Sequence, residues 1–229
     1  MGMSLPVNRV RWEPCWRIIS TRYPEERILS KVADPDDLDL ISDLEQMTND
    51  RLRQERGEVA IVAPVDIVSG PGREYLMAPF TYRNPEGSRF SNGQHGVYYA
   101  ARTLPTAIEE TRHHRETFMS RTKENPMRLE MRVLTADLDG NLHDIRGMQK
   151  KLPQVYSRTS YAASQELGGR LVIESSYGIA YDSVRHRGGE CAAIFRPPAL
   201  SNCRRERNLV FEWNGKEIGK VYELRELSD

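Results

Sequence analysis

The stretch 88–114 constrains the fold more than any other part of this 229-residue chain. It begins with a glycine-punctuated loop and continues into 97–101, a run of small and β-forming residues that predicts a short strand. A helix should begin between Thr103 and Thr106, because Pro105 is well tolerated in the first turn of a helix. The sequence therefore predicts a loop, a strand and a helix in close succession.

One face of the predicted helix carries a carboxylate and an imidazole. Residues at three- and four-residue spacing share a helix face, and here they are Ala107, Glu110, Thr111, His114 and Phe118. This face is otherwise suited to burial, and a buried carboxylate is unfavourable without a partner, for which Arg89 in the preceding loop is a candidate. A loop arginine, a strand tyrosine and a helix carboxylate that converge outline a small-molecule site. The same two charges could instead form a purely structural ion pair, which for an isolated pair is the commoner case.

Composition excludes several classes of protein. Lys plus Arg and Asp plus Glu each number 33, so the formal net charge is zero and gives no overall attraction to nucleic acid or to an anionic membrane. No apolar run is long enough to span a bilayer, and residues 1–11 lack the apolar core of a signal peptide. Cys15, Cys191 and Cys203 lie far apart without metal-binding spacing, so we expect a reduced, cytoplasmic protein with no metal site. The glycine motifs of Rossmann and P-loop enzymes are missing from the sequence.

Hydrophobic periodicity and turn residues predict short strands with a few helices between them. Two further helices are expected, at 38–56 and 161–173. The expected strands are 15–20, 58–68, 74–82, 128–135, 141–145, 178–184, 190–195, 208–213 and 216–224. We expect the last helix to loosen at Gly168 and Gly169, a hairpin turn at 139–141, and a type I′ turn at Asn214-Gly215. This mixture predicts an α+β fold, with a compact mixed sheet core and flanking helices.

The length and the hydrophobic content of 38% suit one domain with a full core, or a domain with an appendage. We expect residues 1–70 to form an extension that packs on or covers a core made by residues 71–229. Within the extension, Arg51 or Arg53 could reach a phosphate, although a solvated helix end is the commoner case. The basic cluster 203–207 is interpreted as a solvated loop. A homo-oligomer through exposed edge strands is the expected assembly.

Four segments of the chain resemble the RES-domain family, which is named for an arginine, a glutamate and a serine. Arg89 precedes an aromatic residue, Tyr99 opens a Tyr-Ala-Ala strand end, and Glu110 follows a Thr-Ala pair, as in that family. Ser183 lies in a Tyr-Asp-Ser-Val-Arg segment that matches the family's Tyr-Pro-Ser-x-Arg, with Asp182 where proline is usual. The matching segments keep the family's order and extend over residues 87–195.

The resemblance implies a fold like that of the ADP-ribosyltransferases, with NAD as the substrate and residues 71–229 as the RES domain. It implies a toxin of a toxin–antitoxin pair that depletes NAD by cleaving the nicotinamide–ribose bond. ADP-ribose would pass to water or to phosphate. The partner implied is a small helix-turn-helix antitoxin of the Xre type that blocks the active site. No direct contact with nucleic acid or membrane is implied.

The resemblance also implies roles for individual residues. Glu110 would stabilise the oxocarbenium-like charge that develops on the ribose, and Arg89 would grip the pyrophosphate with its planar fork. Tyr99 would stack on the nicotinamide, and the adjacent tyrosine should point to the opposite face of the strand. Ser183 would bond the carboxamide or a phosphate. His114, one helical turn after Glu110, would orient that carboxylate or help to bind the substrate.

Two other functions remain open at this point. A transferase that attaches ADP-ribose to a protein would use the same residues and differ only in the acceptor. A non-catalytic module that binds a nucleotide or a partner would not need Glu110. Taken singly, each site residue has an ordinary structural explanation, so the prediction depends on their joint occurrence.

Overall fold

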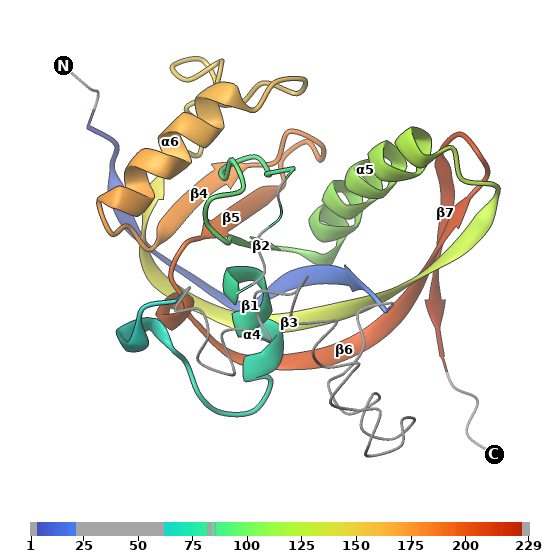
Figure 1. Ribbon diagram of the computed structural model, residues 1–229, viewed down its shortest axis with the longest axis horizontal. Helices are drawn as coiled ribbons and strands as arrows, with labels where there is room; N and C mark the ends of the chain where they lie inside the picture. The colour runs from blue at the N-terminus through green and yellow to red at the C-terminus, as the bar shows by residue number, and fades with distance from the viewer. Residues whose placement is uncertain (1–3, 22–61, 82–83, 85, 226–229) are drawn as a thin grey trace, which may run out of the picture.

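The computed structural model describes residues 4–21, 62–81, 84 and 86–225 (Figure 1). Its strands are β1 (Val7–Ser20), β2 (Tyr98–Ala101), β3 (Met127–Asp144), β4 (Gly178–Asp182), β5 (Glu190–Ile194), β6 (Leu200–Trp213) and β7 (Ile218–Leu224). Its helices are α4 (Arg73–Thr81), α5 (Leu104–Thr122) and α6 (Ala162–Ile173), with 3-10 turns η1 (Pro64–Asp66) and η2 (Pro197–Ala199). This architecture confirms the predicted α+β class. The helix expected at 38–56, with Arg51 and Arg53, lies outside the described residues.

The strands form one strongly curved mixed sheet in the order β1-β2-β5-β4-β3-β6-β7, with β1 also paired to β3. Strand β1 runs antiparallel to β3 along almost its whole length. The opposite edge of β3 pairs with β6 and then, at His143 and Asp144, with the parallel strand β4. Pairing therefore runs from β1 through β2, β5, β4 and β3 back to β1, so these strands close a ring.

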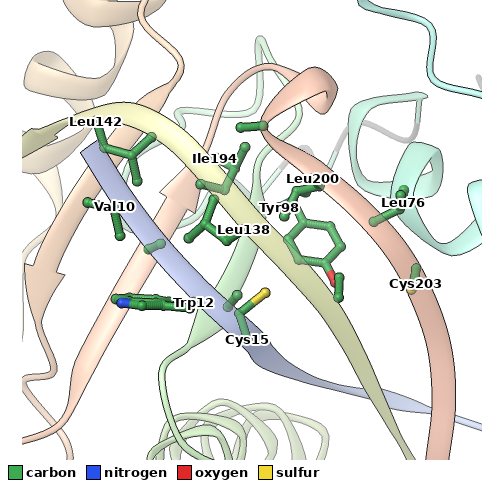
Figure 2. Packing of buried hydrophobic residues seen from close by; sticks show 14 of the residues in the cluster. Val10, Trp12, Cys15, Leu76, Tyr98, Leu138, Leu142, Ile194, Leu200 and Cys203 are labelled. Carbon is green, nitrogen blue, oxygen red and sulfur yellow. The ribbon is translucent and has the colours of Figure 1, made fainter. Parts of the chain in front are cut away.

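Alternation along β2 separates two of the three apolar clusters of the described residues. Tyr98 and Ala100 of β2 belong to one cluster, together with Trp12 and Cys15 of β1, as Figure 2 shows for most of these side chains. Tyr99 and Ala101 belong to, or pack against, the other. The prediction that the two tyrosines point to opposite faces is therefore confirmed, and it follows from the two-residue period of a strand.

Helix α4 packs on the first of these clusters, α6 on the second, and α5 on the second and on the third, which β3, β6 and β7 also form. Helix α4 contributes Leu76 and Phe80 to the first cluster, while α5 and α6 contribute Ala107, Leu167 and Leu171 to the second. In Figure 1, α5 and α6 lie in the upper part of the view, and α4 lies below them, in front of β1 and β3. The candidate site residues Arg89, Tyr99, Glu110 and Ser183 all come from segments around the second cluster.

Helix α5 begins where the sequence predicts. The hydroxyl of Thr103 caps it by accepting a hydrogen bond from the backbone N–H of Thr106, and Pro105 occupies the first turn. Lys123, in a left-handed conformation, ends the helix. The prediction that the face of this helix is buried is wrong at Phe118, which is 52% exposed.

Two of the predicted strands do not exist in the described chain. Residues 74–82 were expected to form a strand, but Arg73–Thr81 is helix α4, because the buried Leu76 and Phe80 lie one helical turn apart. Of the strand expected at 58–68, the described part begins at Val62 and contains the 3-10 turn η1 instead.

The turn expected at 139–141 is also wrong. Strand β3 continues straight through Gly140, which pairs with Val10 of β1, while Leu138 pairs with Leu200 of β6. Partners on both edges hold this stretch extended and override the local turn signal. The cluster 203–207 is likewise part of β6 rather than a loop, and Cys203 is buried.

Two glycine-based expectations are corrected in detail. Helix α6 passes through Gly168 and Gly169 without loosening. The hairpin between β6 and β7 is confirmed, but Trp213 pairs with Ile218, so the connection is a longer turn than type I′. The side chain of Asn214 organises that turn by accepting hydrogen bonds from the backbone N–H groups of the residues two and three positions later.

The expected boundary near residue 70 stays a prediction. The described part before it includes β1, which belongs to the same sheet as the rest of the chain. None of the helices in the described ranges is both long and apolar enough to cross a membrane.

Candidate active site

Arg89 lies almost buried in the loop before β2, with 6% of its surface exposed. Its Nη1 donates to the backbone carbonyls of Val155 (3.1 Å) and Ser157 (3.0 Å), and the guanidinium lies 4.6 Å from the centre of the Tyr161 ring. Within the described residues, Nη1 is the only nitrogen of this guanidinium that makes a hydrogen bond. Neutral carbonyls and an aromatic face therefore hold the cation in place while Nε and Nη2 keep their donors for a ligand.

Tyr99 is hydrogen-bonded to the residues on both sides of Arg89. Its hydroxyl accepts a hydrogen bond from the N–H of Phe90 at 2.9 Å and shares one with the hydroxyl of Ser88 at 2.8 Å. Burial raises the pKa of Tyr99 to about 12, with the hydrogen bonds from Ser88 and Phe90 opposing the rise. The phenol is therefore protonated at neutral pH. This anchoring of the arginine loop was not predicted from the sequence, and Ser88 gave no signal beyond its place in a polar loop.

Ser183 directs its hydroxyl proton at Glu110. Its Oγ accepts hydrogen bonds from the backbone N–H groups of Arg185 (3.1 Å) and His186 (2.9 Å), and it donates to Oε1 of Glu110 at 2.5 Å. Since a hydroxyl has one donor and two acceptor positions, all three are used. Among the described residues, Oε2 of Glu110 has no hydrogen-bond partner, so this oxygen is left for a ligand.

The turn that carries Ser183 is fixed to the same helix as Glu110. Nδ1 of His186 and the hydroxyl of Thr106 lie 2.9 Å apart, which ties this turn to the first turn of α5. Thr106 is completely buried, so the contact is shielded from water. The serine and the glutamate are therefore held at one fixed separation. His186 was not singled out in the sequence, where it is one of several polar residues in a turn.

His114 lies beside the site and is held in its neutral form. Desolvation by the surrounding protein lowers its pKa to about 4, and the positive charges of Arg185 and Arg89 act in the same direction. Desolvation also lowers the pKa of His113 to about 4, and the positive charge of Arg185 acts in the same direction. His114 is nevertheless exposed to solvent, and in the described chain it makes no hydrogen bond to Glu110. No direct contact between His114 and Glu110 therefore supports the predicted orienting role.

The charges of Arg89 and Glu110 affect the pKa of the same buried neighbours. Among the described residues, the two side chains do not form an ion pair with each other. Burial raises the pKa of Tyr181 well above its ordinary value; the Glu110 carboxylate adds to the rise and Arg89 opposes it. Cys191 behaves in the same way, and its Sγ lies 3.9 Å from Oε1 of Glu110. The two charges thus share one electrostatic environment, and the alternative of a structural ion pair between them is not realised.

Comparison with known proteins places this arrangement in a family. A model of the RES domain matches residues 64–214, a range that contains Arg89, Tyr99, Glu110 and Ser183. The chain belongs to the RES domain family. This membership confirms the resemblance seen in the sequence.

Two individual proteins share similarity with this RES domain protein. The uncharacterized protein y4oC of Sinorhizobium fredii is 30% identical over 207 residues, which cover 90% of this chain and 86% of the relative. A chain in the crystal structure of the M. tuberculosis MbcT–MbcA toxin–antitoxin complex aligns with a TM-score of 0.46 at 10% identity, covering 91% of this chain and 87% of that one.

Within the described ranges, no cluster of His, Cys, Asp and Glu side chains is arranged to hold a metal ion.

Proposed function

We propose that this RES domain protein is a toxin that depletes NAD by cleaving the nicotinamide–ribose bond and passing ADP-ribose to water or phosphate. One observation carries the proposal. The guanidinium of Arg89 and the carboxylate of Glu110 lie near the same buried side chains, yet each keeps unused hydrogen-bonding atoms instead of pairing with the other. A diphosphate joined to a ribose presents the complementary pattern, because its anionic part needs a donor fork and its reacting sugar needs a negative charge.

Arg89 is the proposed diphosphate ligand. Nη1 is occupied by two carbonyls, so Nε and Nη2 remain as a pair of donors on one edge of the planar group. Two parallel donors on a rigid plane match two oxygens of a phosphate, which a lysine cannot do with a single ammonium. The neutral imidazole of His114 would lie near this positive charge without adding to it.

Glu110 is the proposed stabiliser of the sugar cation. As the nicotinamide leaves, positive charge builds on the ribose, and a carboxylate fixed beside it lowers the barrier because it needs no reorganisation. The hydrogen bond from Ser183 to Oε1 supports this role, because it would turn Oε2 toward the substrate. Tyr99 is proposed to offer its ring to the nicotinamide while its hydroxyl holds the arginine loop.

The expected partners follow from the proposed toxin function. We propose that a helix-turn-helix antitoxin of the Xre type covers these residues and that the protein works in the cytoplasm, with NAD as substrate and no metal. A homo-oligomer is part of the same proposal. Transfer of ADP-ribose to a protein remains the alternative outcome, since it would need the same residues and a different acceptor.

A nicotinamide-release assay with paired glutamate variants tests the proposal. Glu110→Gln keeps the shape of the side chain and removes the charge, so we expect the turnover number to fall about 10²–10³-fold, the usual loss for a preorganised electrostatic group. Glu109→Gln is the matched control: this neighbour pairs with Arg112 at 3.2 Å and has no contact with Ser183. Circular dichroism and the urea midpoint would verify that both variants remain folded.

The products decide between the acceptors. ADP-ribose alone indicates hydrolysis, ADP-ribose-1-phosphate in phosphate buffer indicates phosphorolysis, and label transferred from NAD to proteins of a cell extract indicates the transferase. Equal nicotinamide release by wild type and Glu110→Gln would overturn the mechanism. Absence of any release or binding of NAD by the wild type would favour a non-catalytic module.

A further inference from the structure

Asp182 is the centre of a hydrogen-bond cluster next to the candidate active site. A single oxygen, Oδ2, accepts hydrogen bonds from the backbone N–H of Gly147 (2.6 Å) and from Nε2 of Gln149 (2.6 Å), and it lies 3.5 Å from the hydroxyl oxygen of Tyr156. The backbone N–H of Asp182 donates back to the Tyr156 hydroxyl at 3.3 Å, and that hydroxyl also donates to the carbonyl of Ile145 at 2.7 Å. Asp182 thus binds the segment 145–157 near both of its ends, through its carboxylate at Gly147 and Gln149 and through its backbone N–H at Tyr156.

This segment is the one that holds Arg89. Tyr156 stands between Val155 and Ser157, whose carbonyls accept the two hydrogen bonds from Nη1 of Arg89. Because the Tyr156 side chain is buried and anchored to Asp182, the two flanking carbonyls have little freedom to move. The position of the arginine therefore depends on Asp182, a residue that makes no hydrogen bond to it.

Asp182 is also adjacent in sequence to the residue that binds Glu110. Asp182 ends β4, and the next residue is Ser183, whose hydroxyl donates to Glu110. One residue thus connects the carbonyls that hold Arg89 with the hydroxyl that holds Glu110. A proline, which the family pattern has at this position, could supply neither the N–H nor the carboxylate that make these contacts.

We infer that Asp182 is a positioning residue that sets the separation between Arg89 and Glu110 by anchoring the segment 145–157 to the end of β4. This inference rests on the proposed function, since it concerns the placement of the diphosphate ligand relative to the group beside the ribose. Misplacement of a binding group by about 1 Å can lower activity on the order of a hundredfold, so an anchor without substrate contact can matter as much as a ligand.

The test compares Asp182→Ala with Asp182→Asn in the full-length protein. ADP-ribose affinity is measured by calorimetry, and the turnover number and KM by nicotinamide release. Asp182→Ala should weaken ADP-ribose binding on the order of tenfold to a hundredfold. Asp182→Asn can place its amide oxygen where Oδ2 lies, so it should bind ADP-ribose more tightly than Asp182→Ala. Asp66→Ala, which removes a half-buried carboxylate bound to Arg196 away from this cluster, is the matched control and should bind as wild type does.

A double-mutant cycle separates positioning from general loss of stability. If Asp182 acts through Arg89, adding Asp182→Ala to Arg89→Lys should weaken ADP-ribose binding much less than it does in the wild type. Additive losses, or equal affinity of Asp182→Ala and the wild type, would overturn the inference.

Hydrogen exchange measured without ligand tests the anchoring by Asp182 independently of the proposed function. Asp182→Ala should speed exchange in peptides that cover 145–157 and leave those of β6 unchanged, whereas Asp66→Ala should not affect 145–157. Unchanged exchange in 145–157 would refute the anchoring even if the wild type bound no ADP-ribose. Absence of ADP-ribose binding by the wild type, with faster exchange in Asp182→Ala, would refute the proposed function and with it the ligand-positioning role, leaving only the anchor.

Discussion

At the scale of single residues, the arginine of the candidate site is held differently from the arginines that form ion pairs elsewhere in the described chain. Arg146 and Arg196 are bound by carboxylates, Arg146 by Asp144 and Glu190, and Arg196 by Asp66. Arg89 is held by carbonyls and a tyrosine ring instead. A guanidinium that is already bound by a carboxylate has little to offer an incoming anion, whereas one oriented by neutral groups keeps its charge available. Together with its place beside Glu110, this contrast is a physical reason to regard Arg89 as a ligand-binding residue.

The two adjacent histidines give a prediction at this scale. The pKa of His113 and of His114 is lowered from 6.5 to about 4, mainly by desolvation. As the pH falls from 6.5 toward 4, the unfolded chain binds protons on these residues before the folded chain does. Their contribution to stability is therefore fully present above pH 6.5 and is lost as the pH falls toward 4.

Two measurements check this behaviour. Titration of the imidazole signals by NMR should give a pKa near 4 for both residues. In urea unfolding, the midpoint of the double variant His113→Gln, His114→Gln should fall less than that of the wild type when the pH is lowered from 6.5 to 5. An ordinary histidine titration in the folded protein would contradict the prediction.

At the scale of elements, the site depends on a close contact between helix α6 and the arginine loop. A Cβ on Gly168 would lie 2.1 Å from the carbonyl oxygen of Phe90, the residue after Arg89. Gln165, one turn earlier, donates to the carbonyls of Ser88 and Ser91. The glycine that the sequence suggested as a weak point of the helix is instead the position at which the helix approaches the loop. Only the tertiary contact explains why it is glycine.

The neighbouring glycines of α6 form a matched pair for a second prediction. Gly169→Ala meets no atom within 4 Å and should raise the free energy of unfolding by about 0.5–1 kcal/mol, the ordinary gain of alanine over glycine in a helix. Gly168→Ala must displace α6 from the loop, and overpacking of this kind lowers the free energy of unfolding by about 1–3 kcal/mol. Urea unfolding measures both changes, and equal effects of the two substitutions would contradict the contact. Nicotinamide release should fall only in Gly168→Ala.

At the scale of the whole molecule, β1 closes the ring of strands that carries the site. Its residues pair with β3 along one edge, and Trp16 pairs with Ala101 of β2 along the other. Val10 and Trp12 fill the cluster inside the ring. The family match begins at residue 64, after β1, yet the strand contributes to the same core as the matched region.

A core substitution in β1 tests whether this strand and the rest of the sheet unfold together. Trp12→Ala should lower the free energy of unfolding of the whole protein by about 3–5 kcal/mol, because it leaves a large cavity. Arg11→Ala changes the adjacent exposed side chain, which is paired with Glu13, and should stay within about 0.5 kcal/mol of the wild type. Urea unfolding followed at the tryptophans and by far-ultraviolet circular dichroism would check this. A separate early transition limited to β1 would instead support residues 1–70 as a detachable extension.

Local signals predicted much of the element list and the residue types of the site. The capped start of α5, the strands β4 and β5 and the hairpin after Trp213 follow from spacing, turn residues and a proline, all of which act within a few residues. Helix α4 was missed because its short apolar pattern also suits a strand. The straight passage of β3 through Gly140 was missed because partners far away in the sequence hold it extended.

The sequence by itself determined which groups are present around the second cluster: a guanidinium, a phenol, a carboxylate and a serine hydroxyl, in the order of the RES family. The tertiary structure alone decided how they are held. The carbonyls of Val155 and Ser157, the anchor at Asp182 and the closure of the sheet by β1 come from segments that are remote in sequence. Backbone carbonyls carry no side-chain signature, and long-range strand pairing is not encoded in any short window. Such contacts therefore become visible only when the chain is folded.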